Sequence, residues 1–206
     1  ELWIRTYDGP GSGEDVARGM AIDRSGNLYV TGESEGVGTA LDYATIKYGP
    51  DGMLQWVARE NRVGSASDVV TALAIDGATP LRDAGNVYVT GGAGQNFHAA
   101  TIKYGPGGNV EWVAAQPDAQ GMRAAVSDVA RGNVIVTGDS GTRLYGPDGR
   151  EQWAAPGPGE ALALDGLGNA FVIGPAGLIQ YRLDGSQGWS ASGPWAAILC
   201  ISWARS

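Results

Sequence analysis

The sequence predicts an all-β protein built from repeated four-stranded antiparallel sheets, and three observations predict it. The pentapeptide Tyr-Gly-Pro-x-Gly recurs along the chain, and a Trp follows each copy. Short apolar segments rich in Val, Ile, Tyr and Thr alternate with Gly, Pro, Asn and Asp, as strands and turns do. Gly, with 34 of 206 residues, and Pro, with 10, imply many turns. No segment has the length and the apolar spacing of an ordinary helix.

Each repeat holds four segments in a fixed order. In the first repeat they are an apolar run at Met20–Asp23, the segment Asn27–Glu33, the segment Tyr43–Tyr48 and a segment around Trp56. The order returns three times, and the last segments then contain Trp112, Trp153 and Trp189. A four-stranded meander that repeats every ~40–50 residues is typical of one blade of a β-propeller. We therefore expect a β-propeller of four-stranded antiparallel blades.

The turns between the segments have the chemistry of hairpins. In Tyr48–Gly52 the Pro stands at the second turn position, which favours its fixed φ, and Gly52 tolerates a positive φ. The stretch Asp23–Asn27 predicts the loop between the first and second segments. In an antiparallel meander these two turns lie on one edge of the blade, and the other two connections lie on the opposite edge.

Several of these motifs together resemble a known repeat family. The run Asp42–Tyr48, the turn Gly-Pro-Asp-Gly, Trp56-Val-Ala and Gly-Asn-x-Tyr-Val-Thr-Gly are similar to the bacterial seven-bladed β-propeller repeat (SBBP) family. The resemblance covers nearly the whole chain and is weaker in the last two units, where the third segment shrinks to Thr142–Tyr145 and Leu178–Tyr181. It implies a secreted or cell-surface bacterial protein, extracellular or periplasmic, and supplies no catalytic residues.

The repeats predict a single domain over residues 1–206, with units at about 14–60, 66–116, 121–156 and 159–192. Terminal strands at 1–8 and 195–203 form a partial blade, with Trp3 on an outer strand. The strand count leaves a small ring, a five-bladed ring with a damaged last blade, or part of a larger propeller. The last two are favoured, because unpaired strand edges and an apolar tail promote aggregation. We expect the two ends to lie near one another or beneath another polypeptide.

Composition excludes several classes of protein. The formal net charge of −8 opposes nucleic acids and anionic membranes as partners. One His and one Cys cannot form a zinc site or a disulfide framework. No apolar run is long enough for insertion into a membrane. The sequence also contains no motif typical of an organic cofactor.

The connections on the edge opposite the Gly turns vary in length, and variable loops on a fixed scaffold often carry binding specificity, although they also vary where nothing constrains them. An insert at Gly77–Ala84 lies instead on the Gly-turn edge. We predict a non-catalytic binding or scaffold module for a protein partner or another chain of an assembly, with carbohydrate as an alternative ligand. The alternative function is a lyase or hydrolase with an axial active site. The binding candidates are Glu33, Glu35, Asp42, Asn61, Arg62, Gln95, Asn96 and His98.

An Asp ends the first segment of every unit, and these residues are Asp23, Asp76, Asp128 and Asp165. Convergent carboxylates could hold a hard cation such as Ca²⁺, which takes ~6–8 oxygen ligands. The favoured interpretation is a turn in which each carboxylate accepts backbone N–H bonds within its own loop. The insert in the second unit, which separates Asp76 from Gly85-Asn86, argues against a ring of four ligands.

Overall fold

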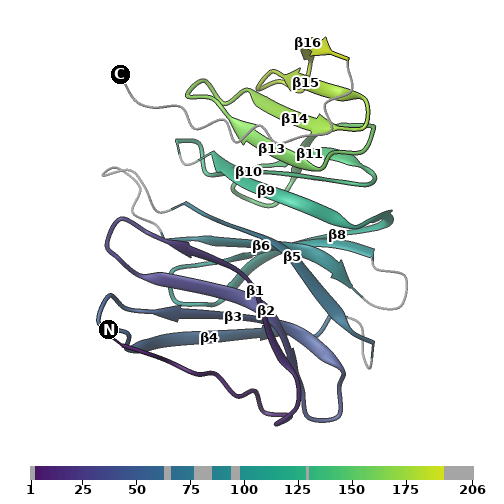
Figure 1. The fold of residues 1–206 in the computed structure, drawn as a ribbon. Helices are drawn as coiled ribbons and strands as arrows, with labels where there is room; N and C mark the ends of the chain where they lie inside the picture. The colour runs from purple at the N-terminus through teal and green to yellow at the C-terminus, as the bar shows by residue number, and fades with distance from the viewer. Residues whose placement is uncertain (1–2, 63–65, 77–84, 94–97, 129, 193–206) are drawn as a thin grey trace.

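A computed structural model describes residues 3–62, 66–76, 85–93, 98–128 and 130–192. These residues form four antiparallel sheets of four strands each and no helix, and the expected all-β fold class is therefore confirmed (Figure 1). Within the described ranges, no helix is long and apolar enough to span a membrane.

The strands of each sheet follow one another in chain order, and we call the sheets blades 1 to 4. Blade 1 contains β1 (Asp15–Ile22), β2 (Leu28–Glu35), β3 (Leu41–Tyr48) and β4 (Leu54–Glu60). Blade 2 contains β5 (Asp68–Ile75), β6 (Val87–Ala93), β7 (His98–Tyr104) and β8 (Val110–Gln120). Blade 3 contains β9 (Met122–Asp128), β10 (Asn133–Gly138), β11 (Gly141–Tyr145) and β12 (Glu151–Ala155). Blade 4 contains β13 (Ala161–Leu164), β14 (Ala170–Gly174), β15 (Gly177–Tyr181) and β16 (Gln187–Ala191).

The four blades stand in a row, with blade 1 and blade 4 at its two ends (Figure 1). The first strands of successive blades contact each other, so that β5 lies against β1 and β9, and β9 lies against β13. Blades 2 and 3 therefore have a neighbour on both faces. Blades 1 and 4 each have one face without a neighbouring blade among the described residues.

The first strands begin earlier than the sequence predicts. We expected an apolar run from Met20, but β1 starts at Asp15 and contains an irregularity between Ala17 and Gly19. Its first half, Asp15–Arg18, mixes charged and small apolar residues and is partly exposed, so it forms no continuous apolar run. Pairing with β2, which continues to Glu35, extends the strand.

The hydrophobic core lies between the blades, in three clusters. The first joins blade 1 to blade 2 and contains the fully buried rings of Tyr29, Tyr43 and Tyr104. The second joins blade 2 to blade 3 around Tyr88 and Met122. The third joins blade 3 to blade 4, and its members include Ile135, Leu144, Val172 and Tyr181. Each face of a central blade is thus buried by the blade beside it.

In blades 1 to 3, a Trp on the last strand lies over a Gly turn of the next blade. The indole N–H of Trp56 donates to the Pro106 carbonyl (2.9 Å), and its ring lies 6.4 Å from that of Tyr104. Gly108 has a φ of 82°, and a Cβ there would meet the Trp56 ring at 2.7 Å. Only Gly meets both requirements. Trp112 and Trp153 repeat the same N–H bond on blades 3 and 4.

Trp3 in the N-terminal segment makes the equivalent contact with the Gly turn of blade 1. Trp3 donates its N–H to the Pro50 carbonyl (3.3 Å), lies 6.1 Å from the ring of Tyr48 and covers Gly52. Residues 3–9 are extended along blade 1 but form no strand ladder, in contrast to the expected terminal strand. The reason is that no described strand lies beside them to pair with.

Candidate functional site

The Asp residues at the ends of the first strands build the turns that follow. The Asn27 amide donates to Asp23 Oδ1 (2.8 Å), and the Asn27 side chain donates to Asp23 Oδ2 (2.7 Å). The same pair of bonds joins Asn86 to Asp76, at 2.7 Å each. A third pair, at 2.9 and 2.8 Å, joins Asn169 to Asp165. Each carboxylate therefore holds its own hairpin.

The third unit differs because its turn is one residue longer. Asp128 there binds Arg131 Nη1 (3.0 Å) instead of an Asn side chain. Among the described residues, no three His, Cys, Asp or Glu side chains come together in a way that could hold a metal ion. The four carboxylates are thus placed in separate loops, and the insert Gly77–Ala84 lies outside the described residues.

The pKa values of these carboxyl groups shift in different directions, depending on how deeply each group is buried. Burial raises the pKa of Asp76 above its ordinary value, and the hydrogen bonds from Asn86 do not offset it. Burial acts in the same direction on Asp23, but the bonds from Asn27 outweigh it and the pKa is lowered. Asp165 behaves like Asp23, with its pKa lowered because bonds from Asn169 outweigh burial.

On the opposite edge of blade 1, a polar cluster forms around Arg59. Its guanidinium donates to the Tyr7 hydroxyl (3.1 Å), to the Ser34 hydroxyl and to Asp42 Oδ2 (3.3 Å). Thr39 in the loop between β2 and β3 also donates to Asp42 Oδ2 (2.9 Å). Asp42 Oδ1 is buried without a hydrogen bond. The cluster ties the first variable loop and the N-terminal segment to the sheet.

Glu33 lies inside the fold, although the sequence placed it at the start of a loop. Its side chain is fully buried in β2, where it accepts Nε–H of Arg18 (2.8 Å) and the amide of Val70 (2.8 Å). The second bond joins blade 1 to blade 2. The Arg18 charge and the Val70 N–H together satisfy a buried carboxylate, as burial requires.

The remaining binding candidates are dispersed along the variable edge. Glu35 ends β2 and accepts the Glu14 amide (3.3 Å). Arg62 lies 3.9 Å from Glu60, and its amide donates to a buried Asp68 (2.7 Å). Asn61 is exposed, and His98 begins β7 at the position that Asp42 has in blade 1. The candidates Gln95 and Asn96, and the predicted strand at 195–203, lie outside the described residues.

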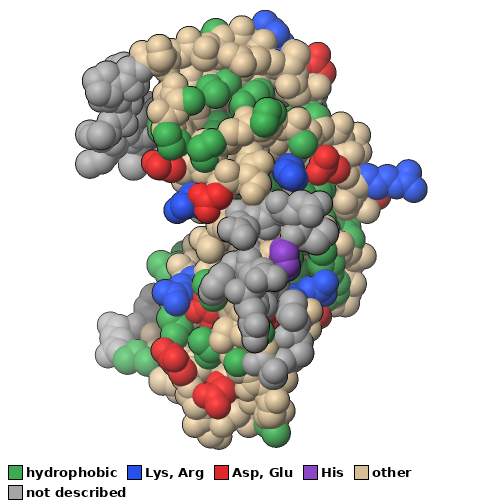
Figure 2. Space-filling view, turned by 90° about the vertical axis from the view of Figure 1, so that its right-hand side faces the viewer, with side chains coloured by type: hydrophobic (Ala, Val, Ile, Leu, Met, Phe, Trp, Pro, Cys, Tyr) green, Lys and Arg blue, Asp and Glu red, His purple; other side chains and the backbone are tan. Residues whose placement is uncertain are grey.

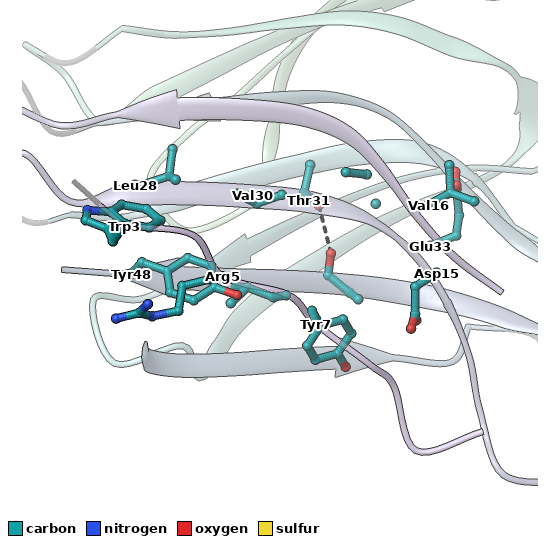
Figure 3. A pocket seen from close by; sticks show the side chains of 14 residues that line it. Trp3, Arg5, Tyr7, Asp15, Val16, Leu28, Val30, Thr31, Glu33 and Tyr48 are labelled. Atoms are coloured by element: carbon teal, nitrogen blue, oxygen red, sulfur yellow. Dashed lines mark hydrogen bonds between the residues drawn. The ribbon is translucent and has the colours of Figure 1, made fainter. Parts of the chain in front are cut away.

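A pocket of about 270 Å³ opens on the face of blade 1 that points away from blade 2 (Figure 3). Trp3, Arg5 and Tyr7 of the N-terminal segment lie on one side of it, and Leu28 and Val30 of β2 line the other. Sequence reasoning missed this pocket. The alternation of Trp3, Arg5 and Tyr7 is the signal that could have indicated it.

The surface view of one side of the molecule shows basic and acidic side chains interspersed, with no large patch of a single charge (Figure 2). Apolar side chains gather at the level of blade 4. There Trp189 is 44% exposed, and it lines a second pocket with Phe171 and Leu178.

Comparison with known proteins supports the repeat. A family model described as a β-propeller repeat (SBBP) matches residues 6–37, which include β1 and β2. Residues 6–37 carry a β-propeller repeat of this type. The expected resemblance is thereby confirmed for this segment. No curated protein sequence matches the chain significantly.

Solved β-propeller-like structures show the same fold. A protein of unknown function from Bacteroides caccae superposes with a TM-score of 0.53 and 17% identity, over 85% of this chain and 60% of that one. A gluconolactonase from Xanthomonas campestris superposes with a TM-score of 0.50 and 14% identity, over 80% and 56%. This chain therefore spans less than two thirds of either structure. At these identities the likeness concerns the fold alone.

Proposed function

We propose that this β-propeller chain is a non-catalytic binding or scaffold module that contacts a protein partner through its variable loops. The supporting observation is the difference between the two edges of the blades. On one edge, the Asp–Asn side-chain bond recurs in three of the four blades, and the Gly turn recurs in all four. On the other, the connection between the second and third strands is longer in blade 1 than in blades 3 and 4, and it projects Val37, which is 77% exposed. Loops that vary on a repeated scaffold are typical of a recognition surface.

A protein is favoured over a carbohydrate as the ligand because most described Trp rings are already engaged. Sugar-binding sites stack their ligands on free aromatic faces. Here the rings of Trp56, Trp112 and Trp153 cover Gly turns, and their N–H groups are bonded to carbonyls. Following the family resemblance, we place the module outside the cell or at its surface.

The proposal is tested by comparing variants of the two edges. Purified chain is immobilised and exposed to the extracellular fraction of its source organism, and captured proteins are quantified by mass spectrometry. Val37→Asp with Asn61→Ala changes the variable edge, and Arg24→Ala with Ser25→Ala is the matched control on the turn edge. We expect the first variant to lose a partner that the wild type and the control retain.

Equal capture by all three proteins contradicts the proposed edge. A glycan array run with the same proteins tests the carbohydrate alternative, which gains support if binding there depends on the variable edge. Turnover of lactone or glycoside substrates by the wild-type chain would instead support the enzyme alternative.

A further inference from the structure

The open face of blade 1 repeats the face with which blade 2 receives its neighbour. Strand register places four residues of β2 and β3 at the positions of four residues of β6 and β7. They are Leu28, Val30, Ile46 and Tyr48 in blade 1, and Val87, Val89, Ile102 and Tyr104 in blade 2. All four are fully buried in blade 2, whereas Leu28 and Val30 are only half-buried in blade 1. The apolar face of blade 1 is therefore formed but incompletely covered.

At the interface of blades 1 and 2, the side chain of Tyr43 from blade 1 packs against the corresponding face of blade 2. The Tyr43 hydroxyl donates to the Gly92 carbonyl (3.2 Å) and lies where a Cβ at Gly91 would approach it to 2.8 Å. A Cβ at Gly91 would also meet the Val69 carbonyl of its own blade, so Gly is required there by the blade itself, and the Tyr43 hydroxyl lies beside it. Gly32 has the equivalent position in blade 1 and lines the open pocket, and a Cβ there would meet only atoms of β1 among its nearest neighbours.

One position on or just before the first strand holds a residue of different size in each blade, and in blade 4 it is Gly159, which lies against Thr137 of blade 3. Val70 in blade 2 packs in one cluster with Tyr43, and the larger Met122 in blade 3 packs in one cluster with Ala99. Register places Ala17 at the same position in blade 1, where it lines the pocket. Because cores are closely packed, the small side chain of Ala17 leaves room at the pocket for a larger side chain than Met122 would allow.

The N-terminal segment already provides the outer strand of such a partner sheet. Trp3 covers Gly52 as Trp56 covers Gly108. Residues 3–7 have no strand beside them among the described residues, so their backbone offers a free edge. An added strand would find hydrogen bonds along this edge and a pocket for its side chain, as in β-augmentation.

We propose that this face of blade 1 binds a β-hairpin of a partner polypeptide, which pairs with residues 3–7 and inserts a tyrosine over Gly32 and Ala17. The surface is separate from the variable loops. A second copy of the chain fits less well, because its Tyr43 is buried within its own fold. If blade 4 of a second copy packed on this face, its Trp189 would have to cover Gly52, and Trp3 already occupies that position.

The first experiment supplies the hairpin within the chain. Residues 24–53 are fused before Glu1, so that the added Gly52 precedes Trp3 by the spacing that separates Gly52 from Trp56. The matched control carries Tyr43→Ala in the added copy only. We expect the fusion to melt about 4 °C or more above the control. Equal melting temperatures overturn the proposal.

The second experiment supplies the hairpin as a separate peptide of residues 24–53, titrated into the full chain by calorimetry. We expect saturable binding that weakens at least tenfold with the Tyr43→Ala peptide or with Ala17→Met in the chain. Binding that neither change affects overturns the proposal. No binding together with a stabilised fusion upholds the docking face, because an isolated hairpin is at best marginally ordered.

Sedimentation of the chain alone tests the other occupant. A concentration-dependent dimer that Ala17→Met dissociates would assign the face to a second copy and overturn the partner hairpin. The Val37→Asp, Asn61→Ala variant serves as a control in both binding experiments, where it should have no effect. A negative result for partner binding through the variable loops can therefore be distinguished from a negative result for hairpin binding on this face.

Discussion

Blade 2 and blade 4 share one backbone plan but differ in what surrounds them. Tyr88 in β6 is fully buried against blade 3, whereas Phe171, at the same register position in β14, packs beside the exposed Trp189. Blade 2 lies between two neighbours, and blade 4 has one among the described residues. The repeat pattern thus fixes strand pairing in both blades, while the free energy of each side chain depends on the adjacent blade.

The largest expected difference concerns these two rings. Tyr88→Ala should lower the free energy of unfolding by about 3–5 kcal/mol, because it removes a fully buried ring and its bond to the Gly132 carbonyl. Phe171→Ala should cost about 1–2 kcal/mol, since the ring is half-exposed. Urea denaturation measures both. Equal losses would mean that blade 4 is covered as completely as blade 2.

The outer Trp residues sharpen the comparison at the rim. Trp112→Phe should cost about 2 kcal/mol, because it removes the N–H bond to Pro147 (3.0 Å) and part of the contact with blade 3. Trp189→Phe should change stability by less than about 0.5 kcal/mol, as exposed substitutions usually do. Thermal melts of both variants check this. A large loss at Trp189 would reveal a partner for its ring.

A buried pair of hydroxyl groups distinguishes blade 2 from blade 4 more subtly. Thr90 and Thr101 share a hydrogen bond (3.1 Å), and Ile173 and Leu178 replace this pair in blade 4. Thr90→Val should cost about 1 kcal/mol, because it leaves the Thr101 hydroxyl without this partner. Ile173→Val, which removes one half-buried methylene, should cost about 0.5 kcal/mol or less. Chemical denaturation distinguishes the two, and a reversed order would contradict the assigned roles.

The smallest expected effect is the pH dependence of the turn carboxylates, which has opposite signs in the two blades. The lowered pKa of Asp165 contributes stability that is present above its unfolded pKa of 3.8 and is lost as pH falls through the folded value. The raised pKa of Asp76 favours the protonated form, so its contribution is present below 3.8 and is lost as pH rises through the folded value.

Replacing each Asp with Asn isolates these contributions. From pH 3 to pH 6, the stability of the wild type relative to Asp165→Asn should rise, and relative to Asp76→Asn it should fall. Denaturation at several pH values provides the measurement. Slopes of the same sign would show that the pKa values of Asp76 and Asp165 shift in the same direction.

The sequence predicted the parts of the fold that local chemistry determines. Turns such as Tyr48–Gly52 depend on Pro and Gly alone, and the Trp positions marked every outer strand. The sequence did not reveal that Glu33 is buried, because its partners Arg18 and Val70 lie on other strands. It also did not reveal the pocket on blade 1, because the apolar residues of β2 and β3 that line it follow the same pattern as those of a covered blade.

The described blades form an open row, so each one contacts only its neighbours in the chain. Such an array behaves as a one-dimensional system, in which stability is a sum of blade and interface contributions and opening proceeds inward from the ends. Amide hydrogen exchange should therefore be fastest in β14 to β16 and slowest in β6 and β10. Any molecule that covers a terminal blade would slow exchange throughout the row, because it adds one more interface to the cooperative unit.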